Sequence, residues 1–242
     1  MATSVRVLGV RVDAVDTAGA VARIGALVEA GGHHQVATVN PEFIMLARRD
    51  PEFARILEAA DLCLADGWGV TWAAKQLGVP LPGRVPGSDF LEPLAGFAAE
   101  RGYRVFFLGA AAGVAEAAAT ALRRAHPRLQ VAGCHAGDAG PEGDAESLAL
   151  IRAARPQILL VAYGHPKQEL WIERNRLRAE VPVAMGVGGA FDFVSGRVPR
   201  APAWMRRVGL EWLYRLGREP WRARRMAVLP AFAIRVLLAA GR

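Results

Sequence analysis

The sequence predicts an α/β fold: a mostly parallel sheet with helices on both faces, followed by a basic C-terminal helical appendage. Between residues 103 and 189, short apolar runs alternate with helical segments, as is typical of parallel strands buried on both faces. With 242 residues, of which 52% are hydrophobic, the chain is long enough to bury a large core. Its positive charge is concentrated in the last fifth, which sets that tail apart from the rest.

The first half of the chain alternates predicted strands and helices. The strands are expected over residues 5–12, 35–40 and 62–66. The helices are expected over 16–30, from Pro41 onward and over 67–78. A glycine pair after residue 30 ends the first helix, and proline suits a first helical position. A loop rich in proline and glycine runs from Pro80 to Gly87, and Ser88 or Asp89 is expected to cap the next helix.

The second half repeats the alternation more regularly. Strands are predicted over residues 103–109, 130–137, 157–164 and 181–189. Helices are predicted between them, over residues 112–125, 142–154 and 166–180. Right-handed crossovers are expected between parallel strands. We therefore assign residues 1–195 to one α/β catalytic domain.

Cysteine usage and hydropathy indicate a cytoplasmic protein. Cys63 and Cys134 lie in apolar runs, which suggests reduced core residues. Neither has metal-ligand spacing to other residues, so no metal and no cofactor are predicted. The first residues alternate in polarity like a strand and lack the apolar core of a signal peptide. No apolar run reaches the roughly 18 uncharged residues that a transmembrane helix needs.

The tail carries the whole positive excess. Residues 197–242 contain 11 arginines, no lysine and two acidic residues, for a charge of +9, whereas residues 1–196 carry −2. Three of the six tryptophans also lie there. The segment 226–240 is too short and, with Arg235, too polar to span a membrane, and Pro230 is expected to kink it. Residues 196–242 are therefore predicted to dock on a membrane surface, the alternatives being a solvated basic tail or a dimer contact.

Ligands of parallel sheets bind beyond the carboxyl ends of the strands. The residues expected at that edge are Asn40, Asp66, Gly109, Gly137, Gly164 and 188–192. Asp66 could act there as a general base, or it could cap a helix. Asn40 also fits a helix cap before Pro41, whereas Thr38, two residues earlier, has no such alternative.

The glycine turns offer further candidates for this edge. FLGAAAG (107–113) could present a helix N-terminus to an anion, although the motif is weak by itself. His165 follows Gly164 and could be catalytic or structural, while Gln168 in the next turn faces the edge. Phe191 and Asp192 could hold a base, or they could form a tight turn.

Several motifs together resemble those of the WecG/TagA/CpsF family of bacterial glycosyltransferases. They are ATVNPEF (37–43), ADGWGV (65–70), RVPGSD (84–89), FLGAAAG (107–113), GHPKQELW (164–171) and the block 188–222. They cover nearly the whole chain, and the last block is the most specific. The resemblance implies a Rossmann-like core and an inverting, metal-independent transferase. His165 is the one visible departure from the family pattern.

The resemblance also implies substrates and roles. The donor would be a UDP-sugar, with an N-acetylhexosamine such as N-acetylmannosamine as its sugar. The acceptor would be a polyprenyl-diphosphate-linked sugar of cell-surface polysaccharide or wall-polymer synthesis, met at the inner face of the membrane. The implied site residues are Asp66 as catalytic base; Thr38, Asn40, Arg84 and Gln168 as pocket residues; Gly109, Gly164, Phe191 and Asp192 as nucleotide site; and Arg215, Arg222 and Arg225 as tail residues that meet the diphosphates.

Two other classes of function remain open. The basic tail with its tryptophans could belong to a nucleic-acid-binding module, because phosphate contacts require only such charge. A nucleotide-dependent oxidoreductase is disfavoured because the first strand–helix turn lacks the necessary glycines. We predict no nucleic-acid partner. The sequence does not decide the sugar, the polymer pathway or whether the chain forms a homo-oligomer.

Overall fold

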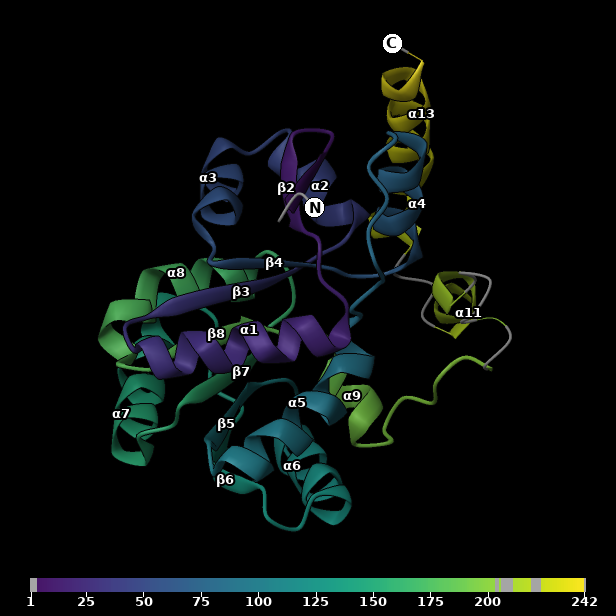
Figure 1. Cartoon of the computed structure of the whole chain (residues 1–242). Helices are drawn as coiled ribbons and strands as arrows, with labels where there is room; N and C mark the ends of the chain where they lie inside the picture. Colours follow the sequence, from purple (N-terminus) through teal and green to yellow (C-terminus); the bar gives the residue numbers. More distant parts are fainter. Residues whose placement is uncertain (1–3, 203–204, 206–210, 219–222, 242) are drawn as a thin grey trace.

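Six parallel strands form the central sheet of the computed structural model, which describes residues 4–202, 205, 211–218 and 223–241 (Figure 1). The strands are β3 (His34–Val39), β4 (Leu62–Ala65), β5 (Arg104–Gly109), β6 (Gln130–His135), β7 (Ile158–Ala162) and β8 (Val183–Gly186). Their order across the sheet is β4-β3-β8-β7-β5-β6, and all neighbours pair in parallel. The predicted parallel sheet is confirmed.

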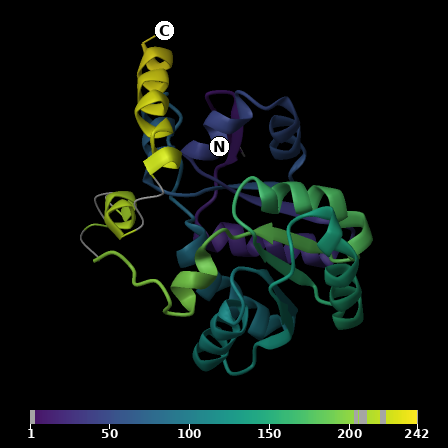
Figure 2. The ribbon, with the colours of Figure 1, turned by 180° about the vertical axis from the view of Figure 1, so that it is seen from behind.

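Helices cover both faces of this sheet, as Figures 1 and 2 show from opposite sides. On one face lie α1 (Thr17–Ala30), α5 (Gly87–Arg101), α6 (Val114–Ala125) and the short α9 (Ala190–Val194). On the other face lie α7 (Asp144–Ala154) and α8 (Lys167–Ala179). Neighbouring residues of β5 serve opposite faces: Phe107 packs in the first cluster and Phe106 in the second. This double burial is why the strands are almost continuously apolar.

A third apolar cluster lies beside β3 and β4, and it includes the end of the chain. It is built from β1 (Ser4–Val7), β2 (Val10–Asp13), α2 (Pro41–Ala47), α3 (Pro51–Ala59), α4 (Trp68–Gln76) and α13 (Val228–Ala240). α13 packs against α2 and α4, and Figure 1 shows it alongside α4. Phe232 and Val236 are its buried residues. The last helix therefore shares a core with the α/β domain.

The predicted strand over residues 5–12 is instead a hairpin. β1 and β2 pair with each other in an antiparallel two-stranded sheet. Leu8 and Gly9 form the turn with φ of 49° and 95°, the left-handed values that tight hairpin turns require. The buried carboxylate of Asp13 accepts a hydrogen bond from the Cys63 N–H at 2.7 Å, which fixes the hairpin to β4.

Two local expectations about helices were wrong. α5 begins at Gly87 after Pro86 and has no side-chain cap, so neither Ser88 nor Asp89 caps it. Asp89 instead forms an ion pair with Arg200 at 2.7 Å. Pro230 does not kink a helix, because it lies in the first turn of α13, where an N–H would have no partner within the helix.

The remaining described elements are short. They are a 3₁₀ turn at Pro141–Gly143, α11 (Glu211–Arg218) and α12 (Ala223–Met226).

Local signals set the boundaries of two of the longer helices. Asp16 caps α1 by accepting from the Gly19 N–H at 2.8 Å, and Gly31 ends that helix with φ of 68°. α3 was not predicted, although Asp50 before Pro51 is a standard start signal and does cap it.

Candidate active site

A cavity of about 1030 Å³ lies at the carboxyl ends of β4, β3, β8 and β7. Most residues predicted for the site line it: Thr38, Asn40, Asp66, Arg84, Gly164, Gln168 and Asp192. They come from five separate parts of the chain, and the parallel sheet brings them to one edge. The structure therefore assembles the predicted polar site around Asp66.

Asp66 directly follows β4, and its backbone N–H is bonded to the carbonyl of Val39 at 2.8 Å. The helix after it, α4, is preceded by Gly67 as its capping residue and has no side-chain cap. The alternative in which Asp66 caps that helix is therefore not what the structure shows. Asp66 lines the cavity instead.

Thr38 and Asn40 approach the cavity from the end of β3. The Thr38 hydroxyl donates to the carbonyl of Gly186 at 3.1 Å and so ties β3 to β8. Asn40 caps α2, because its Oδ1 accepts from the Phe43 N–H at 3.1 Å. The structural alternative for Asn40 is thus confirmed. The cap uses the amide oxygen, so the amide nitrogen can still donate to a ligand in the cavity.

Gln168 joins two glycine turns at the base of the cavity. Its Oε1 accepts from the N–H of Gly164 at 3.1 Å and from the N–H of Gly188 at 2.9 Å. Its Nε2 donates to the neighbouring Glu169 at 2.7 Å. With only 1% of its surface exposed, Gln168 holds the turns that follow β7 and β8 together.

A histidine–carboxylate pair lies beside these turns. His165 Nε2 and Glu42 Oε2 are 3.2 Å apart, and the imidazole ring packs against Phe43 with centroids 5.2 Å apart. Both His165 and Glu42 line the cavity, as does Tyr163. Burial raises the pKa of Tyr163 to about 12, so its hydroxyl stays protonated near neutral pH.

Arg84 adds a positively charged side chain to the polar lining of the cavity. It follows α4 in the proline- and glycine-rich loop and lines the cavity. Within the described part of the chain, no side-chain hydrogen bond or ion pair engages Arg84. Its guanidinium has five donors suited to phosphate or carboxylate, and these are available to a ligand.

Two residues predicted for the nucleotide site lie behind the cavity wall. Phe191 is fully buried and packs against Phe107 with ring centroids 5.3 Å apart. Gly109 adopts φ of 98°, and a Cβ there would lie 2.8 Å from the backbone carbon of Ala162. Neither lines the cavity, and nor does Gly137, because the strand order places β5 and β6 beyond β7. Their contact with a nucleotide remains a prediction.

The tail contributes lining residues from α11, α12 and α13 to the cavity. Its start is fixed by Arg200, which pairs with Asp89 and stacks over Phe193 at 5.2 Å. Among the described tail residues, those that line the cavity are Leu216, Ala223, Met226, Ala227, Leu229, Pro230, Phe232 and Ala233. Arg215 lies in α11 and Arg225 in α12, whereas Arg222 lies outside the described residues. The tail thus contributes an apolar wall.

Residues that the sequence interpretation did not assign also belong to the site. Trp68 and Trp72 line the cavity, and their rings stack with centroids 6.0 Å apart. The available signal was that the two tryptophans, which follow Asp66, are four residues apart and so lie on one helix face. Glu42 lines the cavity from the first turn of α2, where a carboxylate is usually taken for a dipole partner. Glu169, in the first turn of α8, lies buried next to Gln168 and outside the lining.

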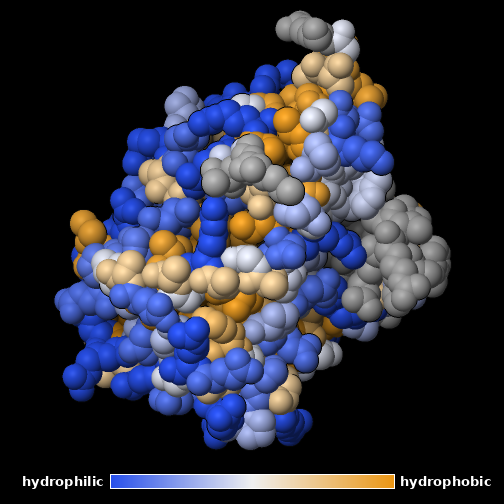
Figure 3. All heavy atoms as spheres, in the orientation of Figure 1, coloured by the Kyte–Doolittle hydropathy of each residue, from blue (hydrophilic) through white to orange (hydrophobic). Residues whose placement is uncertain are grey.

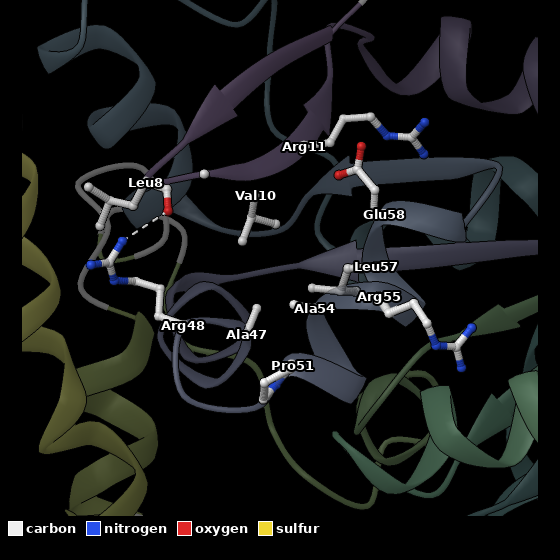
Figure 4. A pocket seen from close by; sticks show the side chains of 11 residues that line it. Leu8, Val10, Arg11, Ala47, Arg48, Pro51, Ala54, Arg55, Leu57 and Glu58 are labelled. Atoms are coloured by element: carbon white, nitrogen blue, oxygen red, sulfur yellow. Dashed lines mark hydrogen bonds between the residues drawn. The ribbon is translucent and has the colours of Figure 1, made fainter.

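A smaller hollow of about 450 Å³ lies between the hairpin and α3. Arg11, Arg48 and Arg55 surround it, but Figure 4 shows that their guanidinium groups point in different directions. Arg48 donates to the Leu8 carbonyl at 3.2 Å, and Arg55 pairs with Glu173 at 3.0 Å. The centre of the hollow is apolar, so this is not a convergent anion site.

Within residues 4–202, 205, 211–218 and 223–241, no three metal-ligating side chains are grouped closely enough to hold a metal ion. In the same ranges, none of the helices has the length and apolar character needed to cross a bilayer.

Comparison with known proteins identifies close relatives. A family model described as Glycosyl transferase WecG/TagA/CpsF family matches residues 5–242. A protein from Bacillus spizizenii is 38% identical over 202 residues, covering 84% of this chain and 78% of the relative. Proteins from Bacillus subtilis and Staphylococcus aureus are 35% and 33% identical over 206 and 201 residues, with 84% and 83% of this chain and 78% of each relative covered. All three are named N-acetylglucosaminyldiphosphoundecaprenol N-acetyl-beta-D-mannosaminyltransferase.

Proposed function

Because the chain belongs to the WecG/TagA/CpsF family of glycosyl transferases, we propose that it transfers N-acetylmannosamine from a UDP-sugar to N-acetylglucosamine linked by diphosphate to undecaprenol. The observation that carries the proposal is the position of Asp66 in a cavity with one polar and one apolar side. The three relatives' names supply the sugar and the acceptor.

The two sides of the cavity suit an amphipathic acceptor. The polar side, with Asp66, Asn40 and Arg84, can bind sugar hydroxyls and phosphate. The apolar side combines Trp68 and Trp72 of α4 with Leu229 and Phe232 of α13, among others. An acceptor oriented with its sugar toward Asp66 places its diphosphate between the sides and its prenyl chain against the tail. Aromatic faces suit both sugar rings and isoprene units.

The donor nucleotide fits the neighbouring part of the sheet edge. β5 and β7 are neighbours in the sheet, but the connection after β5 leads to β6 on one side and the connection after β7 leads to β8 on the other. Ligands of open α/β sheets bind at the crevice where two connections diverge in this way. Gly109 is the last residue of β5, Gly164 lies just after β7, and Asp192 lines the cavity nearby. We assign the nucleotide to this crevice, with Phe191 supporting it from behind.

The proposed reaction is a single displacement at the anomeric carbon. Asp66 takes the proton of the acceptor hydroxyl while UDP leaves from the opposite face of the sugar, which inverts the anomeric configuration. Positioning the two substrates together supplies much of the rate acceleration. Arg84 and the tail arginines Arg215, Arg222 and Arg225 are proposed to neutralise the diphosphates, so no metal is required.

We propose that the tail also rests on the membrane that holds the acceptor. α13 keeps Ile234, Leu237 and Leu238 exposed, at 58%, 54% and 66%, and Figure 3 shows apolar surface along this helix at the upper right. Arg235 lies among them. An apolar helix face that carries an arginine suits the membrane interface, and we place it at the inner side of the membrane.

UDP-N-acetylmannosamine is expected to raise the thermal unfolding midpoint of the protein. A ligand that binds only the folded state stabilises it by RT ln(1 + [L]/Kd), about 2.7 kcal/mol at a hundredfold excess over Kd. The measurement is a thermal shift with a panel of UDP-sugars, with UDP and CDP-sugars as controls for the sugar and the base. A panel in which no UDP compound shifts the midpoint would contradict the proposed donor class.

Transfer is expected to proceed equally well in excess chelator. The reason is that arginines and helix ends, rather than a bound divalent ion, are proposed to stabilise the leaving diphosphate. Initial rates with and without EDTA, followed by readdition of Mg²⁺ or Mn²⁺, test this. A loss of activity that either ion restores would show that the diphosphate site is assigned incorrectly.

A further inference from the structure

A fully buried carboxyl group lies next to the glutamine that joins the two glycine turns. Glu169 is 0% exposed, and its Oε1 accepts from Gln168 Nε2 at 2.7 Å. Its Oε2 is also buried and has no hydrogen-bond partner among the described residues. A buried carboxylate with one side-chain hydrogen bond and no cation is costly, whereas a protonated carboxyl is far less so.

The bonds of Gln168 require one orientation of its amide. Two backbone N–H groups, of Gly164 and Gly188, point at this side chain, and only its oxygen can accept from them. The amide nitrogen must then face the other way, toward an acceptor. Glu169 Oε1 is that acceptor, so the carboxyl group selects the amide orientation that keeps the two turns joined.

The pair is packed tightly against β8. A Cβ at Gly186 would lie 2.5 Å from Glu169 Oε1 and 2.6 Å from Gln168 Nε2. Only a glycine at this position therefore leaves room for both side chains. The same packing prevents either side chain from turning away without moving the strand.

The surroundings favour the neutral form of Glu169. Burial raises its pKa to about 8, an effect that outweighs the hydrogen bonds from Gln168 and from the backbone N–H of Glu169 itself. β7 and β8 carry no titratable side chain. On α8 and the other elements packed against it, each charged group that is buried or partly buried has a partner: His34 pairs with Asp61, Glu173 with Arg55 and Arg176, and Asp144 with Arg174. The remaining charged residues of α3, α7 and α8 are exposed.

We propose that Glu169 is a protonated, neutral positioning residue for the transfer reaction. It orients the Gln168 amide, and Gln168 in turn holds the Gly164 and Gly188 turns at the spacing that the substrates require. The effect on transfer rests on the proposed function. The protonation state and the joining of the turns do not, and both can be measured without turnover.

The first test is stability as a function of pH for wild type, Glu169→Gln and Glu173→Gln. The unfolded glutamate loses its proton near its ordinary pKa of 4.5, whereas folded Glu169 keeps it to about pH 8. The stabilising contribution of this proton is therefore complete below the unfolded pKa and is lost as pH rises through the folded one. Between pH 4.5 and about pH 8 the folding constant of wild type should therefore fall by about tenfold per pH unit relative to that of Glu169→Gln.

Glu173→Gln is the matched control, because Glu173 lies one turn further along α8 and is paired with Arg55. Its stability should follow the wild-type pH dependence, apart from a constant offset. A Glu169→Gln curve that runs parallel to wild type from pH 5 to pH 8 would overturn the neutral state of Glu169.

The second test combines amide hydrogen exchange with pH–rate profiles. Glu169→Ala should speed exchange of the Gly164 and Gly188 amides and lower turnover by about ten- to a hundredfold, because small displacements in an active site are costly. Glu169→Gln keeps the donor–acceptor pattern, so it should restore most of the protection and most of the turnover. Wild type is expected to lose activity above about pH 8 as Glu169 ionises, and Glu169→Gln should not show this decline. Unchanged exchange at both glycines in Glu169→Ala would overturn the positioning role, whatever the activity.

Discussion

Asp66→Asn is expected to lower turnover by about 10²–10⁴ while leaving UDP-sugar binding nearly unchanged, because an amide cannot take the proton of the acceptor hydroxyl. The residue follows β4 at the edge of the sheet, and α4 is not capped by its side chain. The substitution preserves shape, so neither the cavity nor the nucleotide crevice should be distorted.

The measurement is the initial rate with lipid-linked acceptor, together with the thermal shift produced by the UDP-sugar. Asp138→Asn is a suitable control, because Asp138 also follows a strand end but is exposed and does not line the cavity. Its rate should match wild type. Near-normal transfer by Asp66→Asn with the native acceptor would remove Asp66 from the mechanism.

Truncation after Gly196 is expected to abolish both liposome binding and turnover on a soluble, short-chain acceptor. The removed segment includes Leu216, Leu229 and Phe232 of the cavity wall and the three arginines proposed to meet the diphosphates. It also includes the exposed apolar face of α13. A tail that served only as an anchor would be dispensable once the acceptor is soluble.

The truncation needs a stability control, since Phe232 and Val236 are buried in the cluster shared with α2 and α4. A UDP-sugar thermal shift on the truncated protein shows whether the α/β domain is still folded. Leu237→Ser combined with Leu238→Ser separates the two roles, because both side chains are exposed on α13 and outside the cavity lining. This variant should lose liposome binding yet act on the soluble acceptor. Full soluble-acceptor activity in the truncated protein would reduce the tail to an anchor.

The amino-acid sequence by itself determined the class of fold and the position of most polar site residues. Strands buried on both faces must be apolar, and parallel strands must end at one edge, so the apolar runs alone predict Asp66, Asn40 and Gly164 at that edge. The Leu8–Gly9 turn was not found, because its alternating flanks are equally typical of one continuous strand. The α5 start was mispredicted because Asp89 pairs with Arg200, more than a hundred residues away in sequence.

Only the tertiary structure decided which candidates share one cavity. Strand order separated Gly109 and Gly137 from the cavity lining, and no local pattern encodes that order. Packing against Phe107 turned Phe191 away from the cavity that its neighbours line. The burial of Glu169 and the position of α13 along the cavity are likewise products of long-range packing. Periodicity reports which face of an element is apolar. The partner that covers the face, and therefore the environment of each titratable group, is settled only when the chain folds.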